Sequence, residues 1–90
     1  MAKIYSLIGR YIIIEFYGDY FHGNPALYKA EDVNKLLNKT FGTLYKETLE
    51  REEILRGLGY KVIVVWEKDY LNNKNEVLRN SMERILSYEN

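Results

Sequence analysis

The segment Tyr11–Phe16 constrains the fold of this chain more than any other part of the sequence. It reads YIIIEF, and every residue but Glu15 is apolar or aromatic. A strand with one exposed face alternates apolar and polar residues, whereas a strand covered on both faces is apolar throughout. The sequence therefore predicts a strand inside the molecule. A charged residue, Glu15, is unexpected in such a strand.

Two more segments are rich in β-branched and aromatic residues, Lys3–Ile8 and Tyr60–Trp66. Gly9-Arg10 separates the first of them from the strand at Tyr11–Tyr17. A glycine at the first central position favours a two-residue type II′ turn, so we expect a β-hairpin. Tyr60–Trp66 should be a central strand parallel to Tyr11–Tyr17, because a helical crossover separates the two in sequence.

Three segments are expected to be helical. A short helix is predicted at Glu31–Leu37, after a turn-rich loop at Gly18–Tyr28. A longer helix, capped by Thr40 or Thr43, should run to about Leu58, where Gly57 and Gly59 end it. A third, Asn75–Tyr88, carries an apolar stripe at helical spacing, formed by Val77, Leu78, Met82, Ile85 and Leu86. This order predicts one α/β domain over residues 1–90, with a mixed sheet flanked by helices.

Composition excludes several classes of function. The chain has 90 residues, 13 Lys and Arg against 13 Asp and Glu, and no cysteine. A formal net charge of +0 argues against a stand-alone basic coat for nucleic acid. The lack of cysteine excludes a disulfide scaffold, a thiolate zinc site and a cysteine nucleophile. No apolar run is long enough to span a membrane, so an intracellular protein of the cytoplasm, the nucleoid or a host cell is expected, and not a secreted one. A core this small favours a homodimer.

Glu15, Asp19 and His22 form the first candidate site. They lie at the end of a strand and on the loop that leaves it, where α/β proteins bind ligands. Two carboxylates can hold Mg²⁺ or Mn²⁺, and a histidine can move a proton near neutral pH. The structural alternatives stay open at this point: Glu15 could face water or a lysine, Asp19 could belong to a Gly-Asp turn, and His22 could be an ordinary loop residue.

The long helix carries the second set of candidates. Thr48 and Glu52 fall inside its apolar stripe, which Phe41, Leu44, Tyr45 and Leu55 define, and Arg51 falls at the edge. Arg51 could bind a phosphate or a site carboxylate, or it could form a structural ion pair with Glu52 or Glu15. Tyr17, Tyr20 and Phe21 flank the acidic residues and could contact nucleic-acid bases, although packing is the more common role of such aromatic residues.

Two blocks of the sequence resemble a known nuclease family. They are Ile12–Pro25, IIIEFYGDYFHGNP, and Leu49–Glu67, with Arg51, Leu58-Gly59-Tyr60 and Val64-Val65-Trp66-Glu67. Together they resemble the very-short-patch repair endonucleases and related homing-type nucleases of the PD-(D/E)XK superfamily. The resemblance implies a minimal restriction-endonuclease-like fold, Mg²⁺ or Mn²⁺ as cofactor, and hydrolysis of phosphodiester bonds in DNA.

The resemblance also assigns roles to residues. It implies that Glu15, Asp19 and the backbone carbonyl of Phe16 hold the metal, and that His22 assists proton transfer. Arg51 matches the helix arginine of the group, and Thr48 stands where some relatives carry an acid.

The chain departs from the superfamily pattern at one position. The superfamily places a metal-binding aspartate on the strand before Glu15, whereas residues 1–14 contain no acid. A two-residue turn would put Ile4 opposite Glu15, where that acid is expected. The sequence therefore predicts a Mg²⁺-dependent DNA endonuclease or nickase. The alternative is a non-catalytic module of a virus or mobile element that binds nucleic acid or protein on a degenerate nuclease scaffold.

Overall fold

The main sheet of the protein has three strands. The computed structural model describes residues 3–8 and 11–88. The strands are β1 (Lys3–Ile8), β2 (Ile12–Tyr17) and β5 (Lys61–Trp66). β1 and β2 are antiparallel, whereas β2 and β5 are parallel, as the sequence predicted. The chain is therefore an α/β protein with a mixed sheet.

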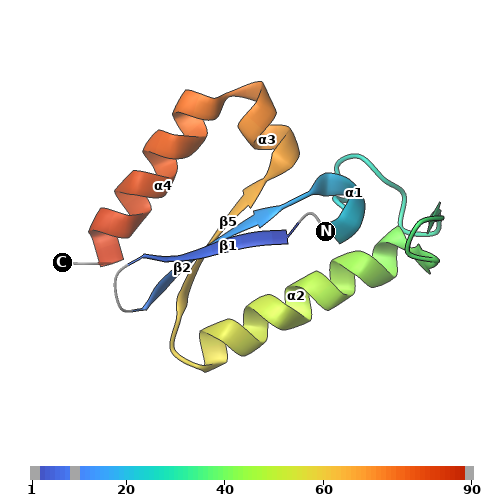
Figure 1. Cartoon of the computed structure of the whole chain (residues 1–90), viewed down its shortest axis with the longest axis horizontal. Helices are drawn as coiled ribbons and strands as arrows, with labels where there is room; N and C mark the ends of the chain where they lie inside the picture. The colour runs from blue at the N-terminus through green and yellow to red at the C-terminus, as the bar shows by residue number, and fades with distance from the viewer. Residues whose placement is uncertain (1–2, 9–10, 89–90) are drawn as a thin grey trace.

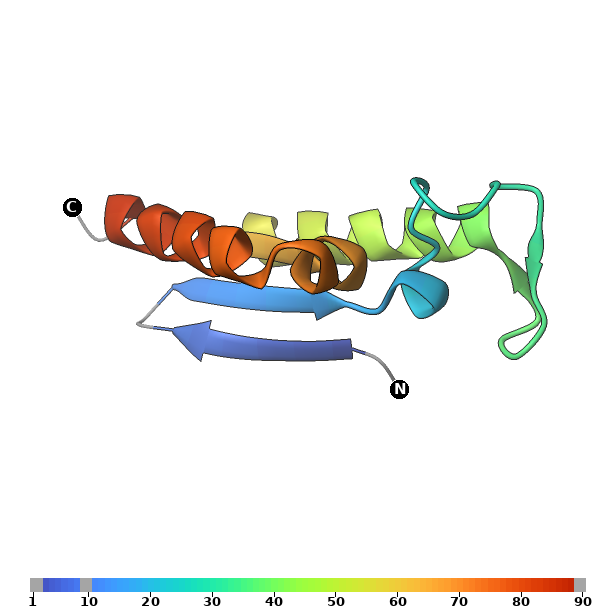
Figure 2. The same cartoon turned by 90° about the horizontal axis from the view of Figure 1, so that it is seen from above.

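β2 is the central strand, because the sheet runs in the order β1-β2-β5. The expectation that Tyr60–Trp66 would be central is wrong, since β5 pairs only with β2 in the part of the chain that the structure describes. Helix α2 lies on one face of the sheet and helices α3 and α4 lie on the other, while β1 runs along the edge beyond the helices (Figures 1 and 2). Protein on both faces of β2 explains its apolar sequence.

The register of the hairpin differs by one residue from the expected one. Ile8 pairs with Ile12, so three residues separate the paired ends of the strands. Tyr5, and not Ile4, lies opposite Glu15 as a result. The predicted type II′ turn at Gly9-Arg10 lies outside the described residues. The position expected for Ile4 is therefore taken by the next residue of β1.

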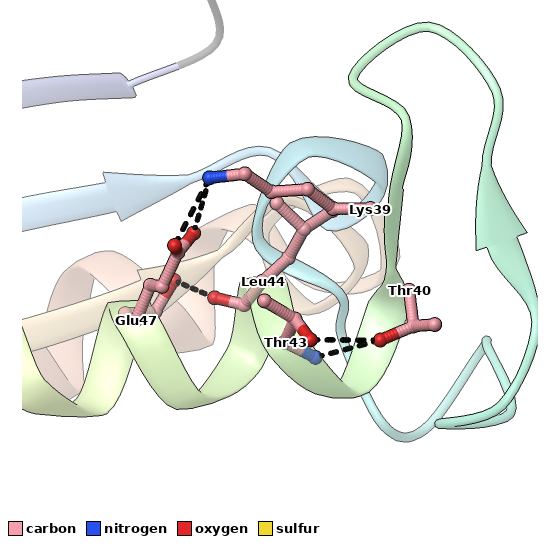
Figure 3. Close-up of polar contacts among 6 residues, drawn as sticks. Lys39, Thr40, Thr43, Leu44 and Glu47 are labelled. Carbon is pink, nitrogen blue, oxygen red and sulfur yellow. Dashed lines mark hydrogen bonds and ion pairs between the residues drawn. The ribbon is translucent and has the colours of Figure 1, made fainter.

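Helix α2 (Phe41–Gly57) connects the two parallel strands, as expected. Of the two capping candidates, Thr40 is the N-cap: its hydroxyl oxygen accepts a hydrogen bond of 3.2 Å from the backbone N–H of Thr43. Figure 3 shows this cap together with Lys39, whose ammonium group lies 3.0 Å from the carboxylate of Glu47 one turn further along the helix.

The C-terminal end of α2 is held by a Schellman motif. The backbone N–H of Tyr60 bonds to the carbonyl of Leu55 at 3.1 Å, and that of Gly59 bonds to the carbonyl of Arg56 at 3.0 Å. Gly59 has φ +99°, a conformation that favours glycine. The sequence placed this stop correctly, and the motif turns the chain directly into β5.

Helix α4 (Lys74–Tyr88) covers the other face of the sheet. Its Ile85 joins Ile12 and Ile63 in the apolar core, with Ile14 packed against them. The predicted apolar stripe is only partly buried. Leu78, Met82 and Leu86 are at least half exposed, at 50%, 55% and 54%.

The connection between β2 and α2 differs most from expectation. It contains a single-turn helix, α1 (Asp19–His22), and a small hairpin of β3 (Val33–Asn34) and β4 (Lys39–Thr40). The predicted helix at Glu31–Leu37 is wrong. The Asn34 side chain accepts hydrogen bonds of 3.0 Å from the backbone N–H groups of Leu36 and Leu37 and so forms a turn in place of a helix.

A further short helix, α3 (Glu67–Asn72), follows β5 directly and precedes α4. Among the described residues, no helix combines the length and the apolar character needed to cross a bilayer.

Candidate functional site

A layer of buried polar side chains lies between β2 and α2. β2 contributes Glu15, and α2 contributes Thr48 and Glu52, each less than 9% exposed. Arg51 is half-buried beside them. The sequence predicted this arrangement on α2 correctly, because Thr48 and Glu52 follow Phe41 and Leu44 at helical spacing.

Glu15 has 0% exposure in the middle of the central strand. Its Oε1 receives a hydrogen bond of 3.1 Å from Arg51 Nε, and Arg51 Nη2 lies 3.1 Å from the same oxygen. The Arg51–Glu15 ion pair, one of the structural alternatives for Arg51, is therefore present. The other carboxylate oxygen of Glu15, Oε2, is buried and has no hydrogen-bond partner among the residues that the structure describes. A buried carboxylate oxygen without a donor is costly, so this atom requires an explanation.

Tyr17 lies two residues further along the same face of β2, with 0% exposure. Burial, together with the negative charges of Glu52 and Glu15, raises the pKa of its phenol well above the ordinary value. Glu52 raises this pKa both by its charge and as a hydrogen-bonding neighbour of the phenol, although among the described residues no acceptor meets full hydrogen-bond geometry with the Tyr17 oxygen. The Glu52 carboxylate is itself paired, at 3.2 Å, with Arg56 one turn along α2.

His22 closes this layer from α1. Its ring stacks on Tyr17, with centroids 4.6 Å apart, and its Nδ1 lies 2.8 Å from Thr48 Oγ1. The Thr48 hydroxyl donates its single proton to the carbonyl of Leu44 at 2.9 Å. It therefore accepts from His22, so Nδ1 carries the proton and Nε2 is the nitrogen that can take up another. The residues fix both the position and the tautomer of His22.

Asp19 makes a different set of contacts. Its Oδ1 accepts hydrogen bonds from Asn24 Nδ2 at 2.9 Å and from the backbone N–H of Lys68 at 3.3 Å. The backbone N–H of Asp19 in turn donates to Glu67 Oε1 at 3.2 Å. The two carboxylates thus cap each other's helix, α1 and α3. The structure brings Glu15, His22, Thr48 and Arg51 into one layer and uses Asp19 to join the ends of β2 and β5.

The aromatic candidates and Phe16 are also placed. Tyr20 makes edge contacts with Tyr28 and Phe41 at 5.9 and 5.6 Å, which hold α1 against the start of α2. Phe21 lies against Tyr20 at 5.7 Å. Phe16 is paired with strands on both sides, so its carbonyl lies in the plane of the sheet, within the ladder.

Comparison with known proteins adds no relative to this picture. Models of known protein families, curated proteins and solved structures all give no match to the chain. The function has to be inferred from the residues themselves.

One carboxylate of the layer suits a divalent cation. The orphaned Oε2 of Glu15 is a hard oxygen donor of the kind that Mg²⁺ and Mn²⁺ prefer. In the described part of the chain, no three His, Asp or Glu side chains group closely enough to hold a metal ion.

Tyr17, Asn24 and Glu67 also shape this region, because each contacts a candidate residue directly. The sequence placed Tyr17 beside the acidic residues but did not reveal the contacts of Asn24 and Glu67. Asn24 precedes the only proline and was therefore assigned to a turn. An asparagine or acid directly after a strand is a usable signal for a helix cap. The two residues that Asp19 contacts in this way, Glu67 and Lys68, lie more than 40 residues further along the chain.

Proposed function

We propose that this protein is a metal-dependent DNA endonuclease or nickase with a restriction-endonuclease-like core. The single observation that carries the proposal is the orphaned, fully buried Oε2 of Glu15 on the face where His22 also lies. An unpaired carboxylate oxygen in an apolar strand is expensive unless it has a ligand. The order β-β-α-β-α and the resemblance of its two sequence blocks to very-short-patch repair endonucleases support this assignment.

Each residue has a defined part in the proposal. Glu15 would hold Mg²⁺ or Mn²⁺, which when bound supplies a Lewis acid and a water of lowered pKa. The resemblance adds Asp19 and the Phe16 carbonyl as ligands, and Asp19 Oδ1 would then have to give up its bonds to Asn24 and Lys68. His22 transfers a proton through Nε2, and Thr48 fixes the ring by accepting from Nδ1. Arg51 orients Glu15 through its ion pair and brings positive charge towards a phosphate.

A plasmid-nicking assay with Mg²⁺ or Mn²⁺ tests the proposal. Glu15→Gln and His22→Ala should each remove most of the cation-dependent nicking, by at least about 100-fold for the proton-transfer residue. Glu50→Gln, an exposed acid on α2, is the matched control and should nick normally. Circular dichroism should show that Glu15→Gln is folded, because the glutamine oxygen can still accept from Arg51. Wild-type protein that nicks nothing with either cation would refute the proposal.

A second function is favoured by the contacts of Asp19. Its Oδ1 is engaged by Asn24 and by the backbone of Lys68, and residues 1–14 contain no acid to replace it. On this basis we infer, as the alternative, a non-catalytic module that binds nucleic acid or a protein partner. DNA binding without nicking in the assay above would favour this alternative.

A further inference from the structure

A second polar surface lies away from the layer around Glu15. It is a pocket of about 330 Å³ where the C-terminal ends of α2 and α4 meet the start of β5. In Figure 1 the end of α2 and the start of β5 lie at the lower left of the molecule, and the C-terminal end of α4 lies at the left above them. The pocket is lined by Arg56, Gly59, Tyr60, Lys61, Val62, Arg84 and Tyr88. The Schellman motif at the end of α2 positions Gly59 and Tyr60 in its wall.

The lining of this pocket is one-sided in charge. It contains three cationic side chains and no acidic one among the described residues. Arg56 is paired with Glu52, whereas Lys61 and Arg84 form no ion pair within the described part of the chain. The formal net charge of the whole chain is +0, so this is a local concentration of positive charge. Cations held together in this way attract an anion.

Tyr88, one of the two tyrosines in the pocket, lies in the same positive field. Arg84 Nη2 lies 3.2 Å from the Tyr88 oxygen, and Lys61 Nζ lies 5.8 Å from the centre of the Tyr88 ring. The hydrogen bond from Arg84, together with the charges of Arg84, Lys61 and Arg56, lowers the pKa of the Tyr88 phenol below its ordinary value. Arg84 also donates to the carbonyl of Val62 at 3.4 Å, which fixes the guanidinium over the start of β5.

We propose that this pocket binds a backbone phosphate of a DNA strand, with Lys61 and Arg84 on the phosphate and Tyr60 beside the adjoining nucleotide. The pocket is larger than one phosphate group. Its cationic side chains are exposed, so a nucleic-acid strand lying across the surface can reach them. The choice of DNA rests on the proposed function.

Fluorescence anisotropy with a fluorescein-labelled DNA oligonucleotide in EDTA tests this site without any chemistry. Lys61→Gln should weaken binding about fivefold and reduce the slope of log affinity against log salt by about one. Lys61 is exposed, and its side chain makes no hydrogen bond to another described residue, so this variant should fold. Arg84→Gln should act in the same direction. Lys35→Gln is the matched control, since Lys35 is an exposed lysine in the β3–β4 turn at the other end of α2, about 25 Å away.

The outcomes separate this inference from the proposed function. Glu15→Gln should lose nicking and keep its DNA affinity, whereas Lys61→Gln should lose affinity and still nick at saturating DNA. DNA binding that depends on Lys61 in a protein that never nicks would support the pocket and refute the nuclease. Equal affinities for Lys61→Gln and Lys35→Gln would overturn the pocket. The proposal would also be overturned if inorganic phosphate displaced the labelled oligonucleotide as well as unlabelled oligonucleotide does at equal phosphate concentration, because the pocket would then bind the free ion.

Discussion

At the scale of single residues, the central strand holds two buried polar atoms for which the described part of the chain provides no hydrogen-bond partner. Glu15 Oε2 and Tyr17 Oη are both buried on the face of β2 that meets α2. Arg51 compensates Glu15 through one oxygen only, and its own side chain is 37% exposed. Breaking a buried ion pair by removing one partner typically costs about 3–5 kcal/mol, so Glu15 depends on Arg51 for stability even before any ligand is considered.

Tyr17 should couple stability to alkaline pH. Its folded-state pKa is raised above the ordinary 10.0, so the native state keeps the phenol proton after the unfolded chain begins to lose it. Its contribution to stability is therefore complete below about pH 10 and is lost as pH rises further. Tyr17→Phe should reduce the alkaline loss, and at pH 7 it should be as stable as wild type or more stable by about 1 kcal/mol, since it removes a buried hydroxyl without an acceptor.

Urea denaturation at pH 7 and at pH 10.5 measures this difference. Tyr88→Phe is the contrast, because the pKa of Tyr88 is lowered and its phenol is exposed. That variant should not reduce the alkaline loss. An identical pH dependence for Tyr17→Phe and wild type would show that Tyr17 does not retain its proton.

At the scale of elements, α1 is held to α2 by a close backbone approach. Gly23 ends α1 with φ +63°, and a Cβ atom there would lie 2.2 Å from the carbonyl oxygen of Phe41. Only glycine fits this junction. The junction positions His22, the residue before Gly23, over Tyr17. The sequence showed a glycine in a turn-rich loop, but the steric reason for it lies 18 residues away, at the start of α2.

Alanine substitutions at two glycines should have opposite effects. Gly23→Ala should destabilise the protein by about 3 kcal/mol, because the new methyl group meets backbone that cannot move without displacing α2. Gly57→Ala is the matched control: it lies in the last turn of α2 with nothing within 4 Å of its Cβ position. It should raise stability by up to about 1 kcal/mol, since alanine is the better helix former. Thermal unfolding of both variants checks this, and a neutral Gly23→Ala would contradict the proposed packing of α1.

At the scale of the whole molecule, the outer side of α4 remains apolar and exposed. Leu78, Met82 and Leu86 follow one another at intervals of four residues, each at least half exposed. Residues spaced by four lie on one side of a helix, so they form a continuous row. The small core of a 90-residue chain gives little reserve of stability, which favours burial of such a row.

We therefore keep homodimer formation as a prediction. Sedimentation equilibrium at micromolar concentration should show a dimer, and Met82→Glu, in the middle of the row, should shift it towards monomer. Glu83→Gln, on the next and exposed position of α4, is the control and should leave the dimer unchanged. Wild-type protein that is monomeric throughout this range would refute the prediction.

The sequence by itself determined the elements whose patterns are local. The buried strand β2, the parallel β5, the capped helix α2 and its glycine stop all follow from apolar periodicity and turn chemistry within a few residues. The same periodicity identified Thr48, Glu52 and Arg51 as polar residues turned towards the sheet. Each of these features depends on neighbours in the chain, so the pattern alone was sufficient.

Only the tertiary structure decided the rest, because the decisive partners are distant in sequence. The Arg51–Glu15 pair joins residues 36 apart, and Asp19 meets Lys68 across 49. The hairpin register, the central position of β2 and the turn built by Asn34 likewise depend on pairing and on side-chain contacts that periodicity does not encode. A carboxylate in a strand can bind an arginine, a helix end or a metal, and the sequence shows the carboxylate without showing which partner the fold brings to it.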